Sequence, residues 1–401
     1  MTAAKQQLKV LLIHTYYQCR GGEDVVFERE ASLLKEAGYD VAELRFNNIK
    51  LSLLKFLLLP FNPFSYFKVM KAIKRFGPDV VHIHNFFFAA SPSIFYAIKK
   101  CKTPSCVTVH NFRFFCPSCT LFHNHKLYSK GLKKGFPWEP IKDKVYRNSA
   151  IATFWVSFCY WLHTLLRTWN KIDTLLFVNP YAQALMERLN PLRYSGAMMV
   201  KENFMDDYAG AMLQRNNSFL YIGRLSEEKG IDILLAAFKD ISKNITIIGD
   251  GPLKNRVEQF ASENINCNYI GFQQKERIIQ ELRQCEALII SSTCMEMAPL
   301  TLVEAMACGT PVIASDVETL KSFISDKKNG ILFNSGNEQS LRDAVINFGS
   351  MPLVKKQAIS KKARATYESY FTKEKCFTNL SVIYNSLINK SQGTHSLHTH
   401  T

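Results

Sequence analysis

The sequence has 401 residues, of which 47% are hydrophobic and 21% charged, and this composition excludes a disordered or fibrous chain. At about 150 residues per domain, the length predicts two or three domains, each with its own core. The N-terminus lacks the long apolar stretch of a signal peptide, the 11 cysteines have no framework spacing, and no run reaches the ~20 apolar residues of a spanning helix. We therefore expect a cytoplasmic protein that is either soluble or bound to a membrane surface.

Short apolar segments alternate with helical patterns in the first half of the chain. A bend at Gly21-Gly22 separates the first expected strand from an amphipathic helix over residues 23–37. Strands are predicted at residues 9–13, 41–45, 80–84, 106–110 and 175–178. Between residues 110 and 175 the alternation stops, so a long insertion is expected there.

A second series of alternating elements starts near Ser218. Asp232 is predicted to cap a helix over residues 233–239, and Pro252 is predicted to open another helix. Strands are predicted at residues 219–222, 245–248, 288–291, 311–314 and 331–333. Short apolar strands between helices indicate parallel sheets covered on both faces. The predicted fold class is α/β, with two doubly wound, Rossmann-like domains that face each other across a cleft.

Positive charge is concentrated in the N-terminal half of the chain. Residues 1–205 hold 28 Lys and Arg against 13 Asp and Glu, whereas residues 206–401 hold 22 against 21. Lys alternates with Leu and Phe within residues 51–75, and three Trp lie in the apolar segment 151–169. Both segments suit an anionic membrane surface, although burial in the protein would explain them equally well. Because no helix-turn-helix, zinc-finger or aromatic RNP pattern is present, nucleic acid is not an expected partner.

Two carboxylates, Glu296 and Glu304, lie eight positions apart on either side of Pro299. Pro299 suits the first position of a helix, which places Glu304 on that helix and Glu296 in the loop before it. Eight helical residues span ~12 Å, whereas the two carboxylates of a retaining glycosidase lie ~5 Å apart. We therefore expect two different roles along one extended ligand. The helix start also offers free backbone N–H groups to an anion.

Two cations, Arg224 and Lys229, follow the expected strand 219–222. Their loop lies at the carboxyl edge of the sheet, where doubly wound folds bind ligands, and together they would neutralise a diphosphate. Solvated surface charge is the alternative, because two glutamates lie between them. Gly21-Gly22 predicts a further anion site in the other domain. Since no Asp-x-Asp triplet occurs, we expect neither a metal nor any other cofactor to assist diphosphate binding.

Three segments, GRLSEEKGID, IIGDGP and EMAPLTLVEAMACGTPVIAS, resemble the retaining nucleotide-sugar glycosyltransferases of family 4, which have the GT-B fold. The resemblance covers nearly the whole chain and is most specific within residues 219–316. The segment HNFRFFCP and the basic insertion after it resemble a subset that acts on surface-polysaccharide acceptors. After the first glutamate the family usually has a pair such as Gly-Phe, whereas this chain has Met297-Ala298.

The resemblance implies roles for four charged residues of the second half. Arg224 and Lys229 would hold the donor diphosphate, Glu304 would bind the ribose hydroxyls, and Glu296 would contact hydroxyls of the transferred sugar. Because no carboxylate is placed beneath the sugar, we expect front-face transfer in which the leaving diphosphate takes the acceptor proton. Negative charge that grows on the leaving phosphate is what the cations and the helix start would stabilise.

Other residues take their roles from the resemblance alone. Gly21 and Gly22 resemble the family's glycine loop close to the phosphate, and His110 resembles its active-site histidine near the sugar. Three residues would contribute backbone contacts along the donor: Pro299, Leu300 and Thr301. The predicted domains are an acceptor-binding domain at 1–203, a nucleotide-sugar domain at 204–370, a helix at 371–390 that crosses back to the first domain, and a disordered tail at 391–401.

The predicted activity is that of a retaining glycosyltransferase of the hexosyltransferase type. Its donor would be a nucleoside-diphosphate sugar, and its acceptor a membrane-associated glycan or lipid-linked intermediate in the synthesis of lipopolysaccharide, capsule or exopolysaccharide. We expect it to be peripheral on the inner face of the membrane. The alternatives are a GT-B nucleotide-sugar epimerase and a non-catalytic basic protein that binds membrane or nucleic acid.

Overall fold

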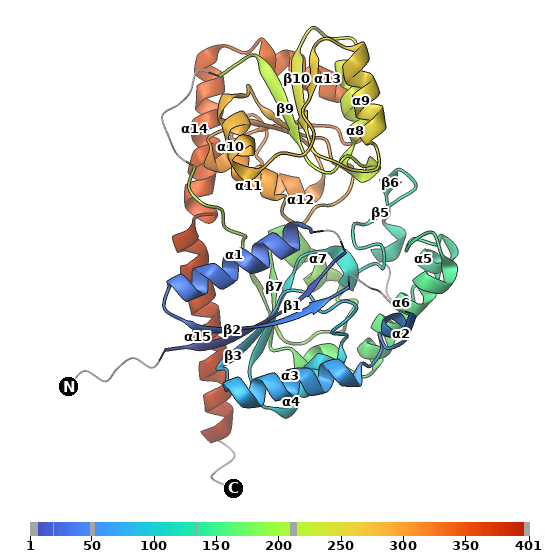
Figure 1. Ribbon diagram of the computed structural model, residues 1–401, viewed down its shortest axis with the longest axis vertical. Helices are drawn as coiled ribbons and strands as arrows, with labels where there is room; N and C mark the ends of the chain where they lie inside the picture. The colour runs from blue at the N-terminus through green and yellow to red at the C-terminus, as the bar shows by residue number, and fades with distance from the viewer. Residues whose placement is uncertain (1–6, 19, 49–52, 133–134, 209–214, 397–401) are drawn as a thin grey trace, which may run out of the picture. The chain divides into compact units, whose positions relative to one another are not determined.

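The computed structural model describes residues 7–18, 20–48, 53–132, 135–208 and 215–396 (Figure 1). The chain divides into two compact units. Unit 1 consists of Met1–Cys119, Ser129–Glu202 and Cys376–Thr401, and unit 2 of Thr120–Tyr128 and Asn203–Lys375. Each unit is built around one parallel sheet, as the alternation of strands and helices predicts.

The sheet of unit 1 has six parallel strands in the order β2-β1-β3-β4-β7-β8. The strands are β1 (Lys9–Tyr16), β2 (Asp40–Asn47), β3 (Val80–Ile83), β4 (Ser105–Val109), β7 (Thr174–Phe177) and β8 (Ala197–Val200). The strand order reverses between β1 and β3, since β2 lies on one side of β1 and all later strands lie on the other. Loops that leave neighbouring strands diverge at such a reversal, and this is where doubly wound sheets bind ligands.

Helices cover both faces of this sheet. They are α1 (Gly22–Glu36), α3 (Pro63–Phe76), α4 (Ser93–Lys100), α7 (Pro180–Leu189) and α15 (Lys373–Ser396), with a 3₁₀ turn at Thr168–Lys171. The last helix, α15, packs with α1 against β1, β3, β4 and β7 through Leu380, Ile383 and Tyr384, which are fully buried. Figure 1 shows α3 and α4 on the opposite side of the sheet from α1. The local sequence determines where α3 begins and ends. The Asn62 side chain caps its start just before Pro63, and Gly77 ends it at φ 63°.

The sheet of unit 2 also has six parallel strands, in the order β11-β10-β9-β12-β13-β14. The strands are β9 (Ser218–Ile222), β10 (Asn244–Ile248), β11 (Cys267–Tyr269), β12 (Leu288–Ile290), β13 (Val312–Ser315) and β14 (Ile331–Phe333). Here the order reverses between β9 and β12. The loops that follow these two strands, together with the helix that begins directly after the second loop, contain most of the predicted donor-binding residues.

The helices of unit 2 form two layers on this sheet. They are α8 (Ile231–Phe238), α9 (Lys254–Glu263), α10 (Lys275–Gln284), α11 (Leu300–Ala307), α12 (Glu318–Lys321), α13 (Glu338–Gly349) and α14 (Leu353–Tyr370), with a 3₁₀ turn at Glu227–Lys229. One buried cluster joins α8 and α13 to the sheet, and a second joins α10, α11 and α14 to its other face. Two separate cores on one sheet give the arrangement expected of a doubly wound domain.

The insertion between β4 and β7 is mostly helical. It contains α5 (Trp138–Lys142), α6 (Ala150–Leu165), 3₁₀ turns at Phe112–Phe114 and Lys130–Leu132, and a hairpin of β5 (Phe122–His123) and β6 (Lys126–Leu127). The first apolar segment forms α2 (Leu53–Leu57), which packs on α6: the Trp155 indole N–H donates to the Phe56 carbonyl oxygen at 2.7 Å. Residues 51 and 52 of that segment lie outside the described residues. No described helix is both long and apolar enough to cross a bilayer.

Several elements differ from the sequence-based expectation. The edge strands β8 and β11 were not predicted. Asp232 does not cap α8. The helix starts at Ile231, two residues before the predicted start, and its N-cap is Gly230 at φ 70°. Pro252 lies in the turn before α9, and Pro299 is the N-cap of α11 rather than its first residue. The polar segment predicted as a disordered tail is helical through Ser396, and residues 397–401 lie outside the described residues.

Candidate functional site

The strand-order reversal of unit 2 brings two loops together. After β9 the chain turns through Gly230, where a Cβ atom would lie 1.9 Å from the Ser291 carbonyl oxygen, so only glycine allows this approach. The Ser291 hydroxyl donates to the Lys229 carbonyl oxygen at 2.9 Å, and the Thr293 amide donates to the Glu228 carbonyl oxygen at 3.0 Å. These bonds fix the backbone of Lys229 beside the loop that carries Glu296.

Lys229 and Glu296 form an ion pair at this point. The Lys229 ammonium contacts one oxygen of the Glu296 carboxylate, and the Ser292 hydroxyl donates to the other oxygen. The two side chains are 27% and 14% exposed, respectively, so both charges are partly desolvated yet reachable from solvent. Desolvation lowers the pKa of Lys229, but the Glu296 carboxylate outweighs it and leaves that pKa above its usual value. Lys229 is therefore a charged ammonium at neutral pH.

Arg224 lies on the same loop as Lys229, and its side chain is exposed. The turn after β10 holds this loop in place, because the Leu225 amide donates to the Asp250 carbonyl oxygen at 2.9 Å. Gly249 is required there, because a Cβ atom would lie 1.9 Å from the Gly223 carbonyl oxygen. The GDGP motif thus acts as a backbone support for the loop of Arg224. Within the part of the chain that the structure describes, the Arg224 guanidinium makes no ion pair.

Glu304 has a basic partner that the sequence did not reveal. It lies on α11 and is 8% exposed, and its carboxylate contacts the ammonium of Lys275 at the start of α10. The Lys275 ammonium also lies 5.2 Å from the ring centroid of Tyr208. Leu300 and Thr301 begin α11 between the two glutamates, one position after the predicted start at Pro299. Unit 2 therefore presents two ion pairs, Lys229–Glu296 and Lys275–Glu304, on loops and helix ends at one edge of its sheet.

The predicted glycine loop lies at the corresponding edge of unit 1. Gly21 is the N-cap of α1 and Gly22 is its first residue. A Cβ atom at Gly21 would meet no atom within 4 Å, so open space adjoins this turn. The Gly21 amide, however, donates to the Asp24 carboxylate at 2.8 Å, and the same carboxylate contacts His14 Nε2 at 2.7 Å. One amide of the predicted anion site is thus already bound by a side chain.

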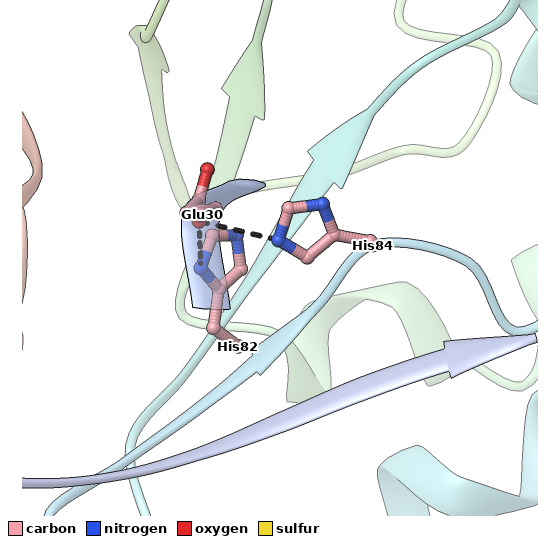
Figure 2. A group of neighbouring side chains, drawn as sticks. All are labelled: Glu30, His82 and His84. Carbon is pink, nitrogen blue, oxygen red and sulfur yellow. Dashed lines mark hydrogen bonds and ion pairs between the residues drawn. The ribbon is translucent and has the colours of Figure 1, made fainter. Parts of the chain in front are cut away.

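His110 lies at the end of β4 in contact with a buried chain of polar groups. Its Nε2 atom lies 3.1 Å from His84 Nδ1, and His84 Nε2 lies 3.2 Å from the Glu30 carboxylate. Glu30 also contacts His82 at 3.0 Å and the ammonium of Lys201. Figure 2 shows the His82 and His84 rings pointing toward Glu30, which lies on α1. Burial raises the pKa of Glu30, but Lys201 and the two histidines hold it well below its usual value.

The ionised Glu30 determines how protons are arranged along this chain. A carboxylate only accepts hydrogen bonds, so His84 carries its proton on Nε2 and offers a lone pair on Nδ1. His110 must then donate from Nε2 to His84, which leaves a lone pair on His110 Nδ1. Burial lowers the pKa of His84 to about 3, and burial and His84 lower that of His110 well below its usual value. His110 is therefore a neutral hydrogen-bond acceptor, suited to a hydroxyl group.

Glu30, His82 and His84 also have the donor atoms of a metal site, all within 4.8 Å of one another. These atoms are already engaged. His82 Nδ1 lies 2.7 Å from the Tyr384 hydroxyl and His82 Nε2 lies 2.7 Å from the Thr108 hydroxyl, while Lys201 supplies a positive charge to Glu30. A divalent ion would have to displace that buried ammonium. The group is better described as a hydrogen-bonded network that orients His84 and, through it, His110.

Unit 1 is expected to lose stability below pH 6.5. Burial lowers the pKa of His84 to about 3 and that of His163 to about 4, so the unfolded chain binds more protons than the folded chain in this range. At pH 5, His84 alone would cost about 2 kcal/mol of unfolding free energy. All four Trp lie within residues 138–169, so Trp fluorescence during denaturation reports on unit 1. Replacing His125, whose side chain is 72% exposed, should leave the pH effect unchanged; equal stability at pH 7 and pH 5 would contradict the prediction.

Sequence families match both units separately. The family "Glycosyltransferase Family 4" matches residues 5–191, and "Glycosyl transferases group 1" matches residues 211–366. An uncharacterized glycosyltransferase of Methanocaldococcus jannaschii is 30% identical over 43% of this chain and 48% of its own length. Alpha-monoglucosyldiacylglycerol synthase of Acholeplasma laidlawii is 29% identical over 43% of this chain and 44% of its own length. Amylovoran biosynthesis glycosyltransferase AmsK of Erwinia amylovora is 26% identical over 42% of this chain and 44% of its own length. The chain thus spans about half the length of the curated relatives it matches.

Solved structures resemble the chain over nearly its full length. Sucrose-phosphate synthase from Thermosynechococcus elongatus has a TM-score of 0.70 at 16% identity and covers 96% of this chain and 100% of its own. Anabaena HepE, solved in complex with UDP and glucose, has a TM-score of 0.67 at 16% identity and covers 95% and 100%. The fold is therefore GT-B, with two Rossmann-like domains, as predicted from the sequence. Together with the two family matches, it supports a glycosyltransferase.

Proposed function

We propose that this chain, a glycosyltransferase of the GT-B fold, moves a sugar with retention from a nucleoside-diphosphate sugar to a membrane-associated glycan or lipid-linked acceptor. The observation that carries this proposal is the Lys229–Glu296 pair at the strand-order reversal of unit 2. A partly exposed ammonium there suits a diphosphate, and a carboxylate beside it suits sugar hydroxyls. Relatives named for glycolipid and amylovoran synthesis support a product in surface glycolipid or polysaccharide.

The reaction would depend on charge stabilisation rather than on a bound metal. Lys229 and Arg224 would hold the diphosphate, with the backbone of residues 299–301 along the donor. Breaking the bond from sugar to phosphate leaves negative charge on the phosphate, and a preorganised ammonium and helix start stabilise it in the transition state. The acceptor hydroxyl would attack from the same face and pass its proton to the leaving phosphate. Binding the diphosphate requires Lys229 to exchange part of its contact with Glu296, which frees that carboxylate for sugar hydroxyls.

The remaining predicted residues would bind the outer parts of the two substrates. Glu304 would accept hydrogen bonds from the ribose hydroxyls, and the Lys275 ammonium contacts the same carboxylate. In unit 1, the lone pair on His110 Nδ1 would accept a hydrogen bond from a sugar hydroxyl. Gly21 and Gly22 would border the phosphate through the open space beside their turn.

Donor binding is the direct test of this function. A thermal-shift panel of UDP-, GDP- and ADP-sugars on the purified chain should give one strong responder, since a ligand at 100 times its dissociation constant stabilises by ~2.7 kcal/mol. Release of the nucleoside diphosphate from that donor should then depend on added acceptor. Conversion of the sugar to an epimer without acceptor would instead identify an epimerase. If no nucleotide sugar shifts the transition, the proposed donor site is wrong.

An apolar face on unit 1 supports the membrane part of the proposal. Helices α2, α3, α5 and α6 and the turns beside them expose large hydrophobic side chains: Leu53, Leu54, Leu57, Phe61, Phe64, Phe67, Trp138, Ile151, Phe154, Leu165 and Leu166. Figure 1 shows α2, α5 and α6 beside one another at the edge of unit 1. Exposed basic residues lie on the same elements or next to them: Lys68, Lys71, Lys74, Arg75, Lys142, Lys144, Arg147 and Arg167. Apolar side chains among cations suit an anionic lipid surface.

Membrane binding is expected to depend on this apolar face. Phe64 is 72% exposed and Leu54 is 61% exposed, so Phe64→Glu combined with Leu54→Glu should leave the fold intact. The pair of substitutions should lower binding to anionic liposomes by at least about tenfold, because it removes two apolar contacts and adds repulsion. Cosedimentation measures this, and Ile265→Glu, at a fully exposed position of unit 2, is the control. Unchanged liposome binding, or salt-sensitive binding to DNA in its place, would contradict a membrane partner.

A further inference from the structure

Two cavities meet at Arg113 in unit 1. The larger has a volume of about 100 Å³ and lies between α6 and the segment 113–117. The smaller, of about 30 Å³, lies beside His84 and His110 at the end of the sheet. Three residues line both: Arg113, Phe114 and Tyr160. Arg113 therefore lies between the histidine chain at the edge of the sheet and a pocket inside the insertion.

The guanidinium of Arg113 is positioned but not neutralised by a bonded partner. It stacks on Phe87, with 3.7 Å between the guanidinium carbon and the ring centroid. Its Nε and Nη1 atoms are buried and have no hydrogen-bond partner among the described residues. Burying unpaired charged donors is costly, so a bound anion would complete their hydrogen bonding. Stacking covers the face of the guanidinium and leaves the N–H groups at its rim available to an anion.

One carboxylate lies close enough to influence Arg113. The Glu23 side chain accepts a hydrogen bond at 2.7 Å from the Asn111 amide, and its other oxygen is buried without a partner. Burial raises the pKa of Glu23, while Asn111 and Arg113 lower it, and the net effect is a raised pKa. Glu23 thus offsets part of the charge of Arg113 but forms no ion pair with it at the distances of a salt bridge.

The wall of the larger cavity is about half apolar and half polar, and much of it comes from α6. Val156 and Phe115 form part of its wall and are buried, and Trp161 also lines it. Ser157 lines it as well; this side chain is 2% exposed, and its hydroxyl has no partner among the described residues. A volume of about 100 Å³ accommodates a sugar ring or a few methylene groups rather than a whole lipid chain.

The cavity opens toward the apolar face described above. Leu165, at the end of α6, lines the cavity and is also 48% exposed. The exposed side chain of Arg193 lies at the same cavity and adds a second positive charge. An amphipathic molecule that enters from a bilayer along α6 would therefore meet apolar walls first and the Arg113 guanidinium at the inner end.

We propose that Arg113 and this cavity form an acceptor site for a phosphate attached to an apolar chain, that is, a lipid-linked phosphate. The phosphate binds the guanidinium of Arg113 through its unpartnered N–H groups, the first part of the chain lies between Phe115, Val156 and Trp161, and Leu165 forms the mouth. This inference deepens the proposed function and rests on it, because only a transferase would use the bound molecule as its acceptor. The binding site itself is a property of unit 1 and does not require a donor.

Octyl phosphate, below its micelle concentration, is the probe for this site. Titration calorimetry and Trp fluorescence, to which Trp161 contributes, should detect its binding to the full chain. Octyl glucoside tests the apolar part alone, and inorganic phosphate tests the anion alone. We expect octyl phosphate to bind at least about tenfold more tightly than either. Equal affinity for inorganic phosphate would identify a free-phosphate site and overturn the lipid assignment, and equal affinity for octyl glucoside would overturn the role of the anion.

Two variants locate the probe. Arg113→Gln should weaken octyl phosphate about tenfold to 100-fold and leave octyl glucoside unchanged, with Arg113→Lys giving partial recovery. Because Arg113 is buried, Leu165→Glu is a second variant at an exposed position, and it should weaken octyl phosphate by a similar factor. Leu166→Glu is the matched control, since Leu166 is 54% exposed on the same face but does not line the cavity. Equal losses at Leu165 and Leu166 would show that the probe binds the surface and would overturn the proposal.

A donor measurement on the same variants separates this inference from the proposed function. Arg113→Gln and Leu165→Glu should leave the thermal shift caused by the responding nucleotide sugar unchanged, because the residues proposed to hold its diphosphate and ribose, Arg224, Lys229 and Glu304, lie in unit 2. Octyl phosphate binding that depends on Arg113, without any response to nucleotide sugars, would support the anion site and refute the glycosyltransferase proposal. If a nucleotide sugar shifts the transition but octyl phosphate binding does not depend on Arg113, the glycosyltransferase proposal is supported and the anion site is refuted.

Discussion

Replacing Lys229 by alanine is expected to lower sugar-transfer turnover by about 10²–10³-fold, the effect of removing one preorganised donor from a developing negative charge. The same change should lower the unfolding free energy by only about 1 kcal/mol, because the side chain is 27% exposed and Ser292 still donates to Glu296. A catalytic role thus predicts a large loss of rate beside a small loss of stability. Turnover with excess donor and acceptor, together with denaturant unfolding, measures both quantities.

Two further variants make this result specific. Lys254→Ala removes an ammonium from α9 of the same unit, where its partner among the described residues is Glu258, and should leave turnover unchanged. Glu296→Gln should keep the bond from Ser292 and leave Lys229 free for phosphate. It should therefore preserve or strengthen binding of the nucleoside diphosphate alone while turnover with the sugar donor falls. If Lys229→Ala lowered stability as strongly as turnover, Lys229 would be a structural residue and the donor site would lie elsewhere.

The sequence predicted those parts of the fold in which local pattern and final environment agree. Central strands of both sheets are buried on both faces, so they appear as short apolar runs; β12, for example, was predicted at 288–291 and observed at Leu288–Ile290. The edge strand β8, with the sequence AMMV, is only half-buried and lacks β-branched residues except at its last position, and it was missed. The start of α8 was misplaced because Gly230 is required by the approach of Ser291, a contact that no local pattern reveals.

The candidate site was predictable only where its residues follow strands that lie side by side in the sheet. Lys229 and Glu296 follow neighbouring strands, so parallel topology alone brings them to one edge of the sheet. Lys275 was missed because it lies 29 positions from Glu304 on an otherwise ordinary polar helix. The partnership of Glu30 with Lys201 spans 171 positions, and its burial depends on α15 closing the sheet from the other end of the chain. Such pairs follow from packing rather than from spacing.

Lys201→Met is expected to destabilise unit 1 by about 3–5 kcal/mol at pH 7, the cost of leaving one member of a buried ion pair uncompensated. The side chains of Lys201 and Glu30 are each 1% exposed, so water cannot replace the lost contact. His82 and His84 remain beside Glu30, but their low pKa values keep them neutral at this pH. Glu30 would then have hydrogen-bond donors but no positive charge. Denaturant unfolding followed by Trp fluorescence measures the loss.

The double variant Glu30→Gln with Lys201→Met tests whether charge is the cause. Removing both charges should recover most of the stability lost in Lys201→Met, because a neutral amide costs far less to bury than an unpaired carboxylate. Exposed Lys142→Met is the control, since it removes a Lys of unit 1 that lies at the surface. If the double variant is no more stable than Lys201→Met, lost packing of the long lysine side chain explains the effect instead.

The pH dependence of the Lys201→Met variant provides an independent test of the same assignment. In the natural chain the folded-state pKa of Glu30 lies below its unfolded value, so its stabilising contribution is present above pH 4.5 and is lost only as the pH falls further. Without Lys201, burial should raise the folded-state pKa above the unfolded value, and the variant should then gain relative stability on acidification. The difference in unfolding free energy between the two proteins should therefore shrink from pH 7 to pH 5. A difference that stays constant over this range would mean that losing Lys201 does not raise the folded-state pKa of Glu30 into it, and the dependence of the Glu30 charge on Lys201 would be wrong.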